Sequence, residues 1–239
     1  MKKGIVIAII ALSGLVGNAQ SVKFGSKLGL NVNSIIRNTS INQFEDEVKV
    51  GYMAGTYMDI SLSKRFHLQF ELLYAKNKYD TTEESSINPA SPTDLISNAN
   101  VTLNPTDAIQ QSVSENYKTA YINVPMLAKI YPVKWWSIDA GVQAGYLLDA
   151  KRLVQENVTI TPTGGNVNPS VSLSSTPLDE VAIKEFDRIQ FGALIGSTLY
   201  FTKNINLGLR YDLGITNLRS NSGTTEKNGI YSASLGYSF

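Results

Sequence analysis

The chain has 239 residues, with 21 basic and 20 acidic residues, one histidine and no cysteine. The lack of cysteine excludes disulfides, thiolate metal sites and a lipoprotein anchor, and the near-neutral charge gives no indication of a nucleic-acid partner. The length suits one domain.

The first nineteen residues have the three parts of a secretory signal peptide. Lys2 and Lys3 form a basic start, an apolar run extends over residues 4–16, and small residues at 17 and 19 suit a cleavage site. This run is too short to span a bilayer, and an uncleaved anchor is the alternative. We expect a signal peptide over 1–19 and one mature domain over 20–239.

Eight later segments alternate apolar and polar residues, which is typical of strands because successive side chains point to opposite faces. In chain order they lie at about 22–31, 48–62, 66–74, 121–130, 136–149, 188–201, 205–213 and 229–239. The predicted fold is all-β, an eight-stranded antiparallel up-and-down transmembrane β-barrel, since single-chain bacterial barrels have even strand numbers. The last strand should pair with the first and abolish both sheet edges.

Short and long connections alternate between these segments. Residues 61–65, 132–135 and 202–204 are short turns, whereas residues 34–47, 80–114, 153–187 and 217–228 are long and polar. This is the pattern of outer-membrane barrels, with short periplasmic turns, long extracellular loops and both termini in the periplasm. A soluble barrel would instead turn its apolar residues inward.

Charged residues share the polar face of the predicted strands. If that face met lipid, each basic residue near the midplane would cost roughly 2–4 kcal/mol, so we expect it to line the lumen. Eight strands leave an interior only wide enough for side chains. We therefore predict a lumen plugged by a polar network, with a continuous aqueous channel as the alternative. The predicted network consists of Lys27, Asp59, Glu71, Lys129, Asp139, Arg188, Arg210 and Asp212.

Four further features follow from the same alternation. Asp149 and several glycines fall on the inward face, and the glycines should make room for charged side chains and ease bending. Aromatic residues near the strand ends should form girdles at the two membrane interfaces. Lys76 and Lys78 should lie outward at the headgroup level, where they could meet lipid phosphates. Pro125 should cause a bulge or local break, because proline cannot donate a ladder hydrogen bond.

Five segments resemble the PorT-like outer-membrane β-barrel family of Bacteroidota. They are FGSKLGLNVN (24–33), LQFELLY (68–74), YINVPMLAK (121–129), GYLL (145–148) and RYDLGITN (210–217). They come in the order of the family and cover most of the mature chain, and Pro125 belongs to one of the family's motifs. The resemblance implies an eight-stranded outer-membrane barrel. It implies little about activity, although the founding member is linked to gliding and type IX secretion.

The sequence predicts no catalytic, cofactor or metal site. His67 has no motif around it and lies on the inward face near a short turn, so a hydrogen-bonding role is favoured over general-base catalysis. The acidic residues at 45–47 and 179–180 lack calcium-loop spacing. Three functions stay open: a structural or interaction protein at the envelope, a channel for ions or small solutes, and a lipid- or peptide-directed enzyme.

The last strand carries a predicted signal for assembly into the outer membrane. Tyr237 and Phe239 lie on the apolar face of the last strand, and the terminal aromatic resembles the residue read by the outer-membrane assembly machinery. The expected partners are therefore outer-membrane lipid or lipopolysaccharide, the assembly machinery and an envelope or secretion complex, and the expected location is the cell outer membrane.

Overall fold

The computed structural model describes residues 21–37, 45–47, 49–87, 108–161, 171–175, 178–181, 186–217 and 226–239. The signal peptide expected over 1–19 lies outside these residues and stays a prediction. Almost all of the described chain is antiparallel strand. Within this part of the chain, no helix is long and apolar enough to cross a membrane.

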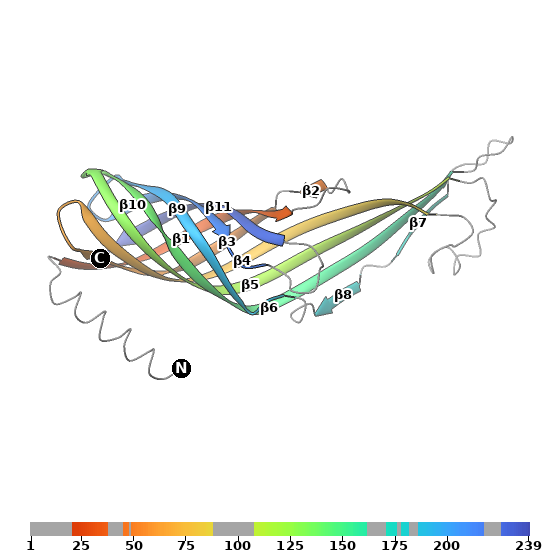
Figure 1. The fold of residues 1–239 in the computed structure, drawn as a ribbon, viewed down its shortest axis with the longest axis horizontal. Helices are drawn as coiled ribbons and strands as arrows, with labels where there is room; N and C mark the ends of the chain where they lie inside the picture. The colour runs from red at the N-terminus through yellow and green to blue at the C-terminus, as the bar shows by residue number, and fades with distance from the viewer. Residues whose placement is uncertain are drawn as a thin grey trace.

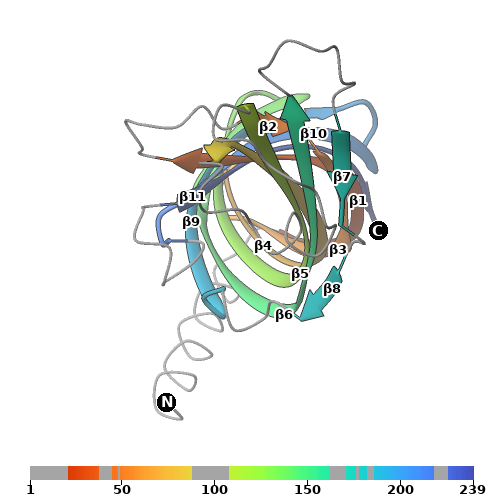
Figure 2. The same ribbon diagram turned by 90° about the vertical axis from the view of Figure 1, so that its right-hand side faces the viewer.

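Eight strands close into a ring, which confirms the predicted fold (Figure 2). They are β1 (Ser21–Arg37), β3 (Lys49–Ser61), β4 (Phe66–Ile87), β5 (Ala108–Val133), β6 (Trp136–Thr161), β9 (Ile189–Tyr200), β10 (Ile205–Gly214) and β11 (Glu226–Ser238). Each strand pairs with its neighbours, and β1 pairs with β11 as predicted, with Leu28 opposite Leu235. Three short strands lie outside the ring: β2 (Glu45–Glu47) pairs with β4, and β7 (Val171–Ser174) and β8 (Leu178–Val181) pair with β6.

The outer wall of the ring is apolar. Leu28, Ile195 and Leu209 expose 64%, 60% and 54% of their surface, whereas Lys27 and Lys129 on the opposite face expose 7% and 2%. Such a wall would be unfavourable in water, and a lipid environment removes that cost. The strands therefore turn their apolar residues outward and their polar residues into the lumen, as the alternation predicts.

Three tight turns connect β3 to β4, β5 to β6 and β9 to β10 at one end of the barrel, as predicted (Figure 1). Hydroxyl groups shape two of them. Ser63 Oγ accepts from the Phe66 amide at 3.1 Å, and Thr202 Oγ1 accepts from the Ile205 amide at 2.9 Å. These contacts are typical of turns in which a side chain replaces a backbone acceptor.

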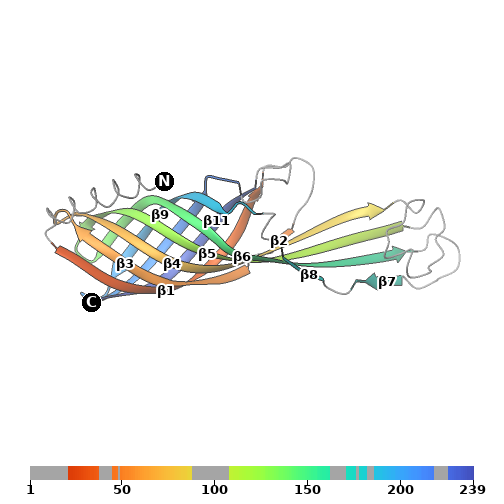
Figure 3. The ribbon, with the colours of Figure 1, turned by 90° about the horizontal axis from the view of Figure 1, so that it is seen from below.

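The other end of the barrel differs from the prediction. The segments 80–114 and 153–187 were expected to be loops, but β4 continues to Ile87, β5 starts at Ala108 and β6 continues to Thr161. These parts, 77–87, 108–120 and 149–161, project beyond the other strands as a three-stranded sheet that we call the blade (Figures 1 and 3). Its outer face is largely polar, and its other face mixes polar side chains with buried apolar ones such as Tyr79, Tyr117, Val158 and Ile160, so no continuous apolar alternation marked these segments as strand.

A β-bulge corrects one inward assignment. Ala120 pairs with Asp149 but Tyr121 pairs with Leu147, so Leu148 is an extra residue in β6. The extra residue reverses the parity of the strand beyond it. Asp149 is consequently exposed on the outer face, whereas the uninterrupted alternation predicted an inward position.

Pro125 produces a local break without a change of register. Its pairing with Gln143 of β6 is regular, but the β4–β5 ladder is interrupted between the Phe70–Met126 and Leu73–Asn123 pairs. The interruption lies on the β4 side of Pro125. This is the break predicted from the missing amide hydrogen.

Two inward glycines permit close packing between strands. A Cβ at Gly55 would stand 2.0 Å from the Leu72 carbonyl oxygen, and a Cβ at Gly141 would stand 2.0 Å from that of Met126. The obstacle is backbone rather than a charged side chain. At these two positions glycine permits the close approach of the neighbouring strand, and the predicted role of making room for lumenal charges does not apply.

Candidate functional site: a lumen filled by side chains

A buried carboxylate joins three strands in the lumen. Glu71 of β4 accepts two hydrogen bonds from the Arg210 guanidinium of β10, at 2.9 and 3.0 Å, and its Oε1 lies 2.6 Å from Lys27 Nζ of β1. The two-pronged arginine contact fits carboxylate geometry well. Three of the predicted network residues therefore meet at one point.

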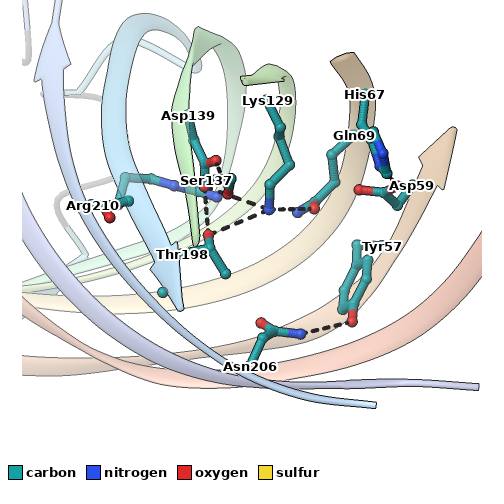
Figure 4. A network of polar contacts seen from close by, with 12 residues as sticks. Tyr57, Asp59, His67, Gln69, Lys129, Ser137, Asp139, Thr198, Asn206 and Arg210 are labelled. Atoms are coloured by element: carbon teal, nitrogen blue, oxygen red, sulfur yellow. Dashed lines mark hydrogen bonds and ion pairs between the residues drawn. The ribbon is translucent and has the colours of Figure 1, made fainter. Parts of the chain in front are cut away.

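A second cluster joins β5, β6 and β9. Lys129 Nζ lies 3.5 Å from Asp139 Oδ2 and donates to Thr198 Oγ1 at 3.3 Å. Asp139 also accepts from Ser137 at 2.7 Å and from Thr198 at 2.5 Å. Figure 4 shows Lys129 extending across the lumen between Asp139 and Gln69. The charge of Lys129 is thus solvated by protein groups from several strands.

Gln69 connects the two clusters. Its Oε1 accepts from Lys129 at 3.0 Å, and its amide donates to Glu71. The sequence marked Gln69 as inward but gave no reason to select it, because the link depends on the register of β4 against β5. The result is a continuous polar network across the width of the barrel.

Apolar and amide groups fill the lumen beyond this network. Met53, Leu73 and Ala75 pack together as a buried cluster, which the prediction of a lumen plugged by a polar network did not include. Beyond them, Asn31 donates to Asn77 at 3.2 Å. The lumen therefore changes from charged to apolar to amide-lined along its axis.

Asp212 and Arg188 lie apart from the two clusters. Asp212 borders a cavity of about 30 Å³ in the amide-lined part, together with Gln143, Gln190 and Asn228. A cavity of this size can hold a water molecule. Arg188 is exposed and donates to the outward Tyr146 hydroxyl at 3.4 Å. Its predicted lumenal position is wrong because β9 begins only at Ile189.

The turn end of the lumen opens into a basic vestibule of about 370 Å³. Lys64, Lys134 and Lys203 come from the three tight turns and line it. Its inner wall is closed by a hydrogen bond of 2.7 Å between the hydroxyls of Tyr131 and Tyr200. The sequence gave no indication that these three lysines share one opening.

His67 has partners that the sequence analysis missed. Its Nδ1 lies 2.6 Å from Asp59 Oδ1, and Ser61 Oγ lies 3.3 Å from Nδ1 and 3.2 Å from Nε2. The three residues are those of a serine hydrolase triad. Proton abstraction would require Ser61 Oγ to lie on the axis of Nε2. Because Ser61 Oγ is almost equally far from both nitrogens, however, it lies beside the ring. The arrangement suits structural hydrogen bonding.

The described residues contain no cluster of side chains suited to a metal ion. Among them, no group of three or more histidine, aspartate or glutamate side chains could hold a metal ion. What the geometry provides is a filled barrel with a basic vestibule at one end and a blade at the other.

Comparison with known proteins agrees with this architecture. The family model described as outer membrane protein beta-barrel domain matches residues 18–220. The chain belongs to this outer-membrane β-barrel family. The barrel is therefore an outer-membrane protein, and from the general rule for such barrels we expect its short turns in the periplasm and the blade outside the cell.

The chain is also similar, at low sequence identity, to several solved structures of outer-membrane proteins. Ail, the attachment invasion locus protein of Yersinia pestis, solved with the heparin analogue sucrose octasulfate, is 10% identical, with 92% of this chain and all of Ail covered and a TM-score of 0.41. Neisserial surface protein A is 12% identical, with 92% and 100% covered and a TM-score of 0.34. An outer membrane channel of Pseudomonas putida F1 is 9% identical, with 91% and 95% covered and a TM-score of 0.29. No curated protein matches the chain.

Proposed function

We propose that this protein is a non-conducting outer-membrane barrel that holds its blade outside the cell as a binding surface. The observation that carries the proposal is the unequal length of its strands. A membrane-spanning strand needs roughly 9–11 residues, and β10 has 10, whereas β5 has 26. More than half of β5 therefore lies beyond what the membrane requires, and a membrane anchor alone has no use for it.

The filled lumen supports the non-conducting part of the proposal. Lys129 and Glu71 expose only 2% and 3% of their surface although they lie in the barrel interior. An ion crossing the barrel would have to separate Glu71 from Lys27 and Arg210, which hold it at 2.6 to 3.0 Å. A buried ion pair is costly to break because each charge is left unpaired.

The outer face of the blade supports the binding part. Beyond its lysines, this face consists largely of hydroxyl and amide side chains in register across three strands. Ser112 pairs with Asn157, and Gln110 pairs with Ser86 and Thr159. Such groups donate and accept hydrogen bonds at low desolvation cost, as in binding surfaces that recognise polar partners. The chemistry fits a polar surface partner.

The resemblance to the PorT-like barrels of Bacteroidota supports a narrower version of the proposal. In this version the partner belongs to a surface or secretion assembly, and the chain reaches the outer membrane after cleavage of the signal peptide over 1–19. Tyr237 and Phe239 would then serve as the assembly signal. A partner on the periplasmic side is the competing arrangement, because the tight turns also carry polar groups.

Site-specific crosslinking in native cells tests the proposal. A photo-reactive amino acid at Ser112 samples the outer face of the blade, and the same amino acid at Ser63 samples a periplasmic turn. We expect a discrete adduct from position 112 that disappears when the neighbouring Asn157 is changed to Lys, with folding of the barrel unaffected. An adduct from position 63 alone would overturn the proposal in favour of a periplasmic partner.

A further inference from the structure

Three lysines lie in one row across the outer face of the blade, near the ring. Lys78 of β4 is directly opposite Lys118 of β5, and Lys118 is directly opposite Lys151 of β6. All three are exposed. We call them the lysine row. Like charges at directly opposite positions destabilise a sheet, so the row is unfavourable for the isolated protein and calls for an anionic partner.

Nothing in the described part of the chain neutralises the lysine row. Lys76 adds a fourth positive charge one residue pair closer to the ring, where Ala120 and Asp149 complete the next row. Asp149 and Asp80 are acidic residues of this neighbourhood, and Asp149 forms no ion pair with these lysines. By contrast, Lys49 lies 2.8 Å from Asp80. Since Asp80 is paired with Lys49, the lysine row and Lys76 leave four positive charges around Asp149.

The surface beside Lys118 and Lys151 of the lysine row is hollowed. A cavity of about 220 Å³ is lined by Lys76, Lys118, Lys151 and Asp149. Ala120, between the charged residues, is small and buried, so the long side chains stand around a depression. A compact anion with part of its carrier can enter such a depression and contact several ammonium groups at once.

The height of the row identifies the source of the anion. Tyr74 and Tyr146 lie on the same outer face and are linked through Ile122 in one cross-strand row. Outward aromatic residues of barrels mark the membrane interface. Lys78 comes four residues after Tyr74, about 14 Å along a strand, and less along the membrane normal because barrel strands tilt. The lysine row is therefore level with the headgroups of the outer leaflet.

We propose that the lysine row and Lys76 bind the phosphate groups of lipopolysaccharide. Lysine is a compact cation that suits phosphate, and several donors around one phosphate give strong charge-assisted hydrogen bonds. Binding removes the repulsion between the lysines and fixes lipid against one side of the barrel. The site is independent of any partner bound further out on the blade.

The test uses the purified full-length protein in detergent micelles and fluorescent lipopolysaccharide. The row variant combines Lys78→Gln, Lys118→Gln and Lys151→Gln, and the matched control combines Lys64→Gln, Lys134→Gln and Lys203→Gln in the periplasmic turns. We expect the Kd to rise at least tenfold in the row variant and to stay unchanged in the control. Wild-type binding should weaken with added salt and be lost with dephosphorylated lipopolysaccharide.

A second readout separates a ligand site from a structural role. Without lipopolysaccharide, the row variant should unfold at a higher temperature than the wild type, because it lacks the like-charge contacts. If the row variant does not fold, Lys118→Gln alone should change both readouts in the same directions, since Lys118 has a lysine on either side.

Several results would overturn the proposal. Equal affinity of the wild type and the row variant, an equal loss in the control, or undiminished binding of dephosphorylated lipopolysaccharide would each exclude this site. Inorganic phosphate that competes at the same low concentration would indicate a free-phosphate site. Competition by an acidic polypeptide but not by lipid would assign the row to a protein partner.

Discussion

At the scale of single residues, Glu71 holds the central position in the lumen. It contacts Lys27 and Arg210 directly and Lys129 through Gln69. All of these side chains come from different parts of the sequence, so their meeting depends on the closure of the barrel. The carboxylate balances two positive charges that are largely buried, with side chains 7% and 10% exposed.

Replacing Glu71 with Gln should therefore destabilise the barrel strongly. The amide keeps the shape but leaves Lys27 and Arg210 without a counter-charge, and we expect the free energy of unfolding to fall by about 3–5 kcal/mol. Urea unfolding in micelles measures this. Glu115→Gln is the control, because the Glu115–Arg152 pair is partly exposed, and we expect a loss under about 1 kcal/mol there. Equal losses of unfolding free energy in the two variants would show that Glu71 is no more important for stability than a partly exposed ion pair.

Gly141 tests the packing between strands. Alanine would place a Cβ 2.0 Å from the Met126 carbonyl oxygen, so β5 and β6 would have to separate locally, at a cost of about 1–3 kcal/mol. Gly192→Ala is the matched control, since its Cβ would meet the Leu213 oxygen only at 3.2 Å. Thermal unfolding should distinguish the two variants, and identical midpoints would show that the close approach is not required.

At the scale of elements, the sequence predicted those strands that carry an apolar face. Alternation located all eight ring strands and the β1–β11 closure, because lipid on one side and a filled lumen on the other impose a period of two. The blade has no lipid-facing side, so its strands carry no such signal. Asp149 was misplaced because a bulge changes parity without a sequence mark, and Arg188 because it precedes the start of β9.

The contacts within the lumen were less predictable than the faces. Parity gave the inward position of Lys27, Glu71 and Arg210, but which charge meets which depends on strand register and tilt. The same holds for His67, whose contacts with Asp59 and Ser61 arise only when the β3–β4 turn brings the strands together. Alternation along a strand predicts which face a side chain occupies. The contacts between side chains across the lumen can be read only from the structure.

The end of β11 carries the prediction for assembly. Phe239 exposes 75% of its surface, and its amide donates to the Phe24 carbonyl at 2.8 Å across the seam. Deleting Phe239 should lower the amount of protein in the outer membrane more than it weakens the folded barrel. Phe201→Ala, which removes an equally outward aromatic at the same rim, should leave the amount unchanged. Normal levels of the truncated protein would refute the role of Phe239.

At the scale of the whole molecule, the barrel combines a filled lumen with a polar blade at one end and a basic vestibule at the other. The blade reaches away from the cell, the lysine row lies at the outer headgroups, and the basic vestibule opens toward the periplasm. The polar network, the apolar cluster around Met53 and the amide layer separate the two openings. This interior therefore provides no continuous water-filled path across the membrane.

Single-channel recording in planar bilayers shows whether side chains close the lumen to ions. The purified wild-type barrel should give no sustained current steps, because the side chains around Glu71 and Lys129 fill the lumen. A variant that shortens both at once, Glu71→Ala with Lys129→Ala, provides the comparison and should give intermittent openings if it inserts. Stable, uniform current steps from the wild-type protein would contradict the plugged barrel and establish a channel.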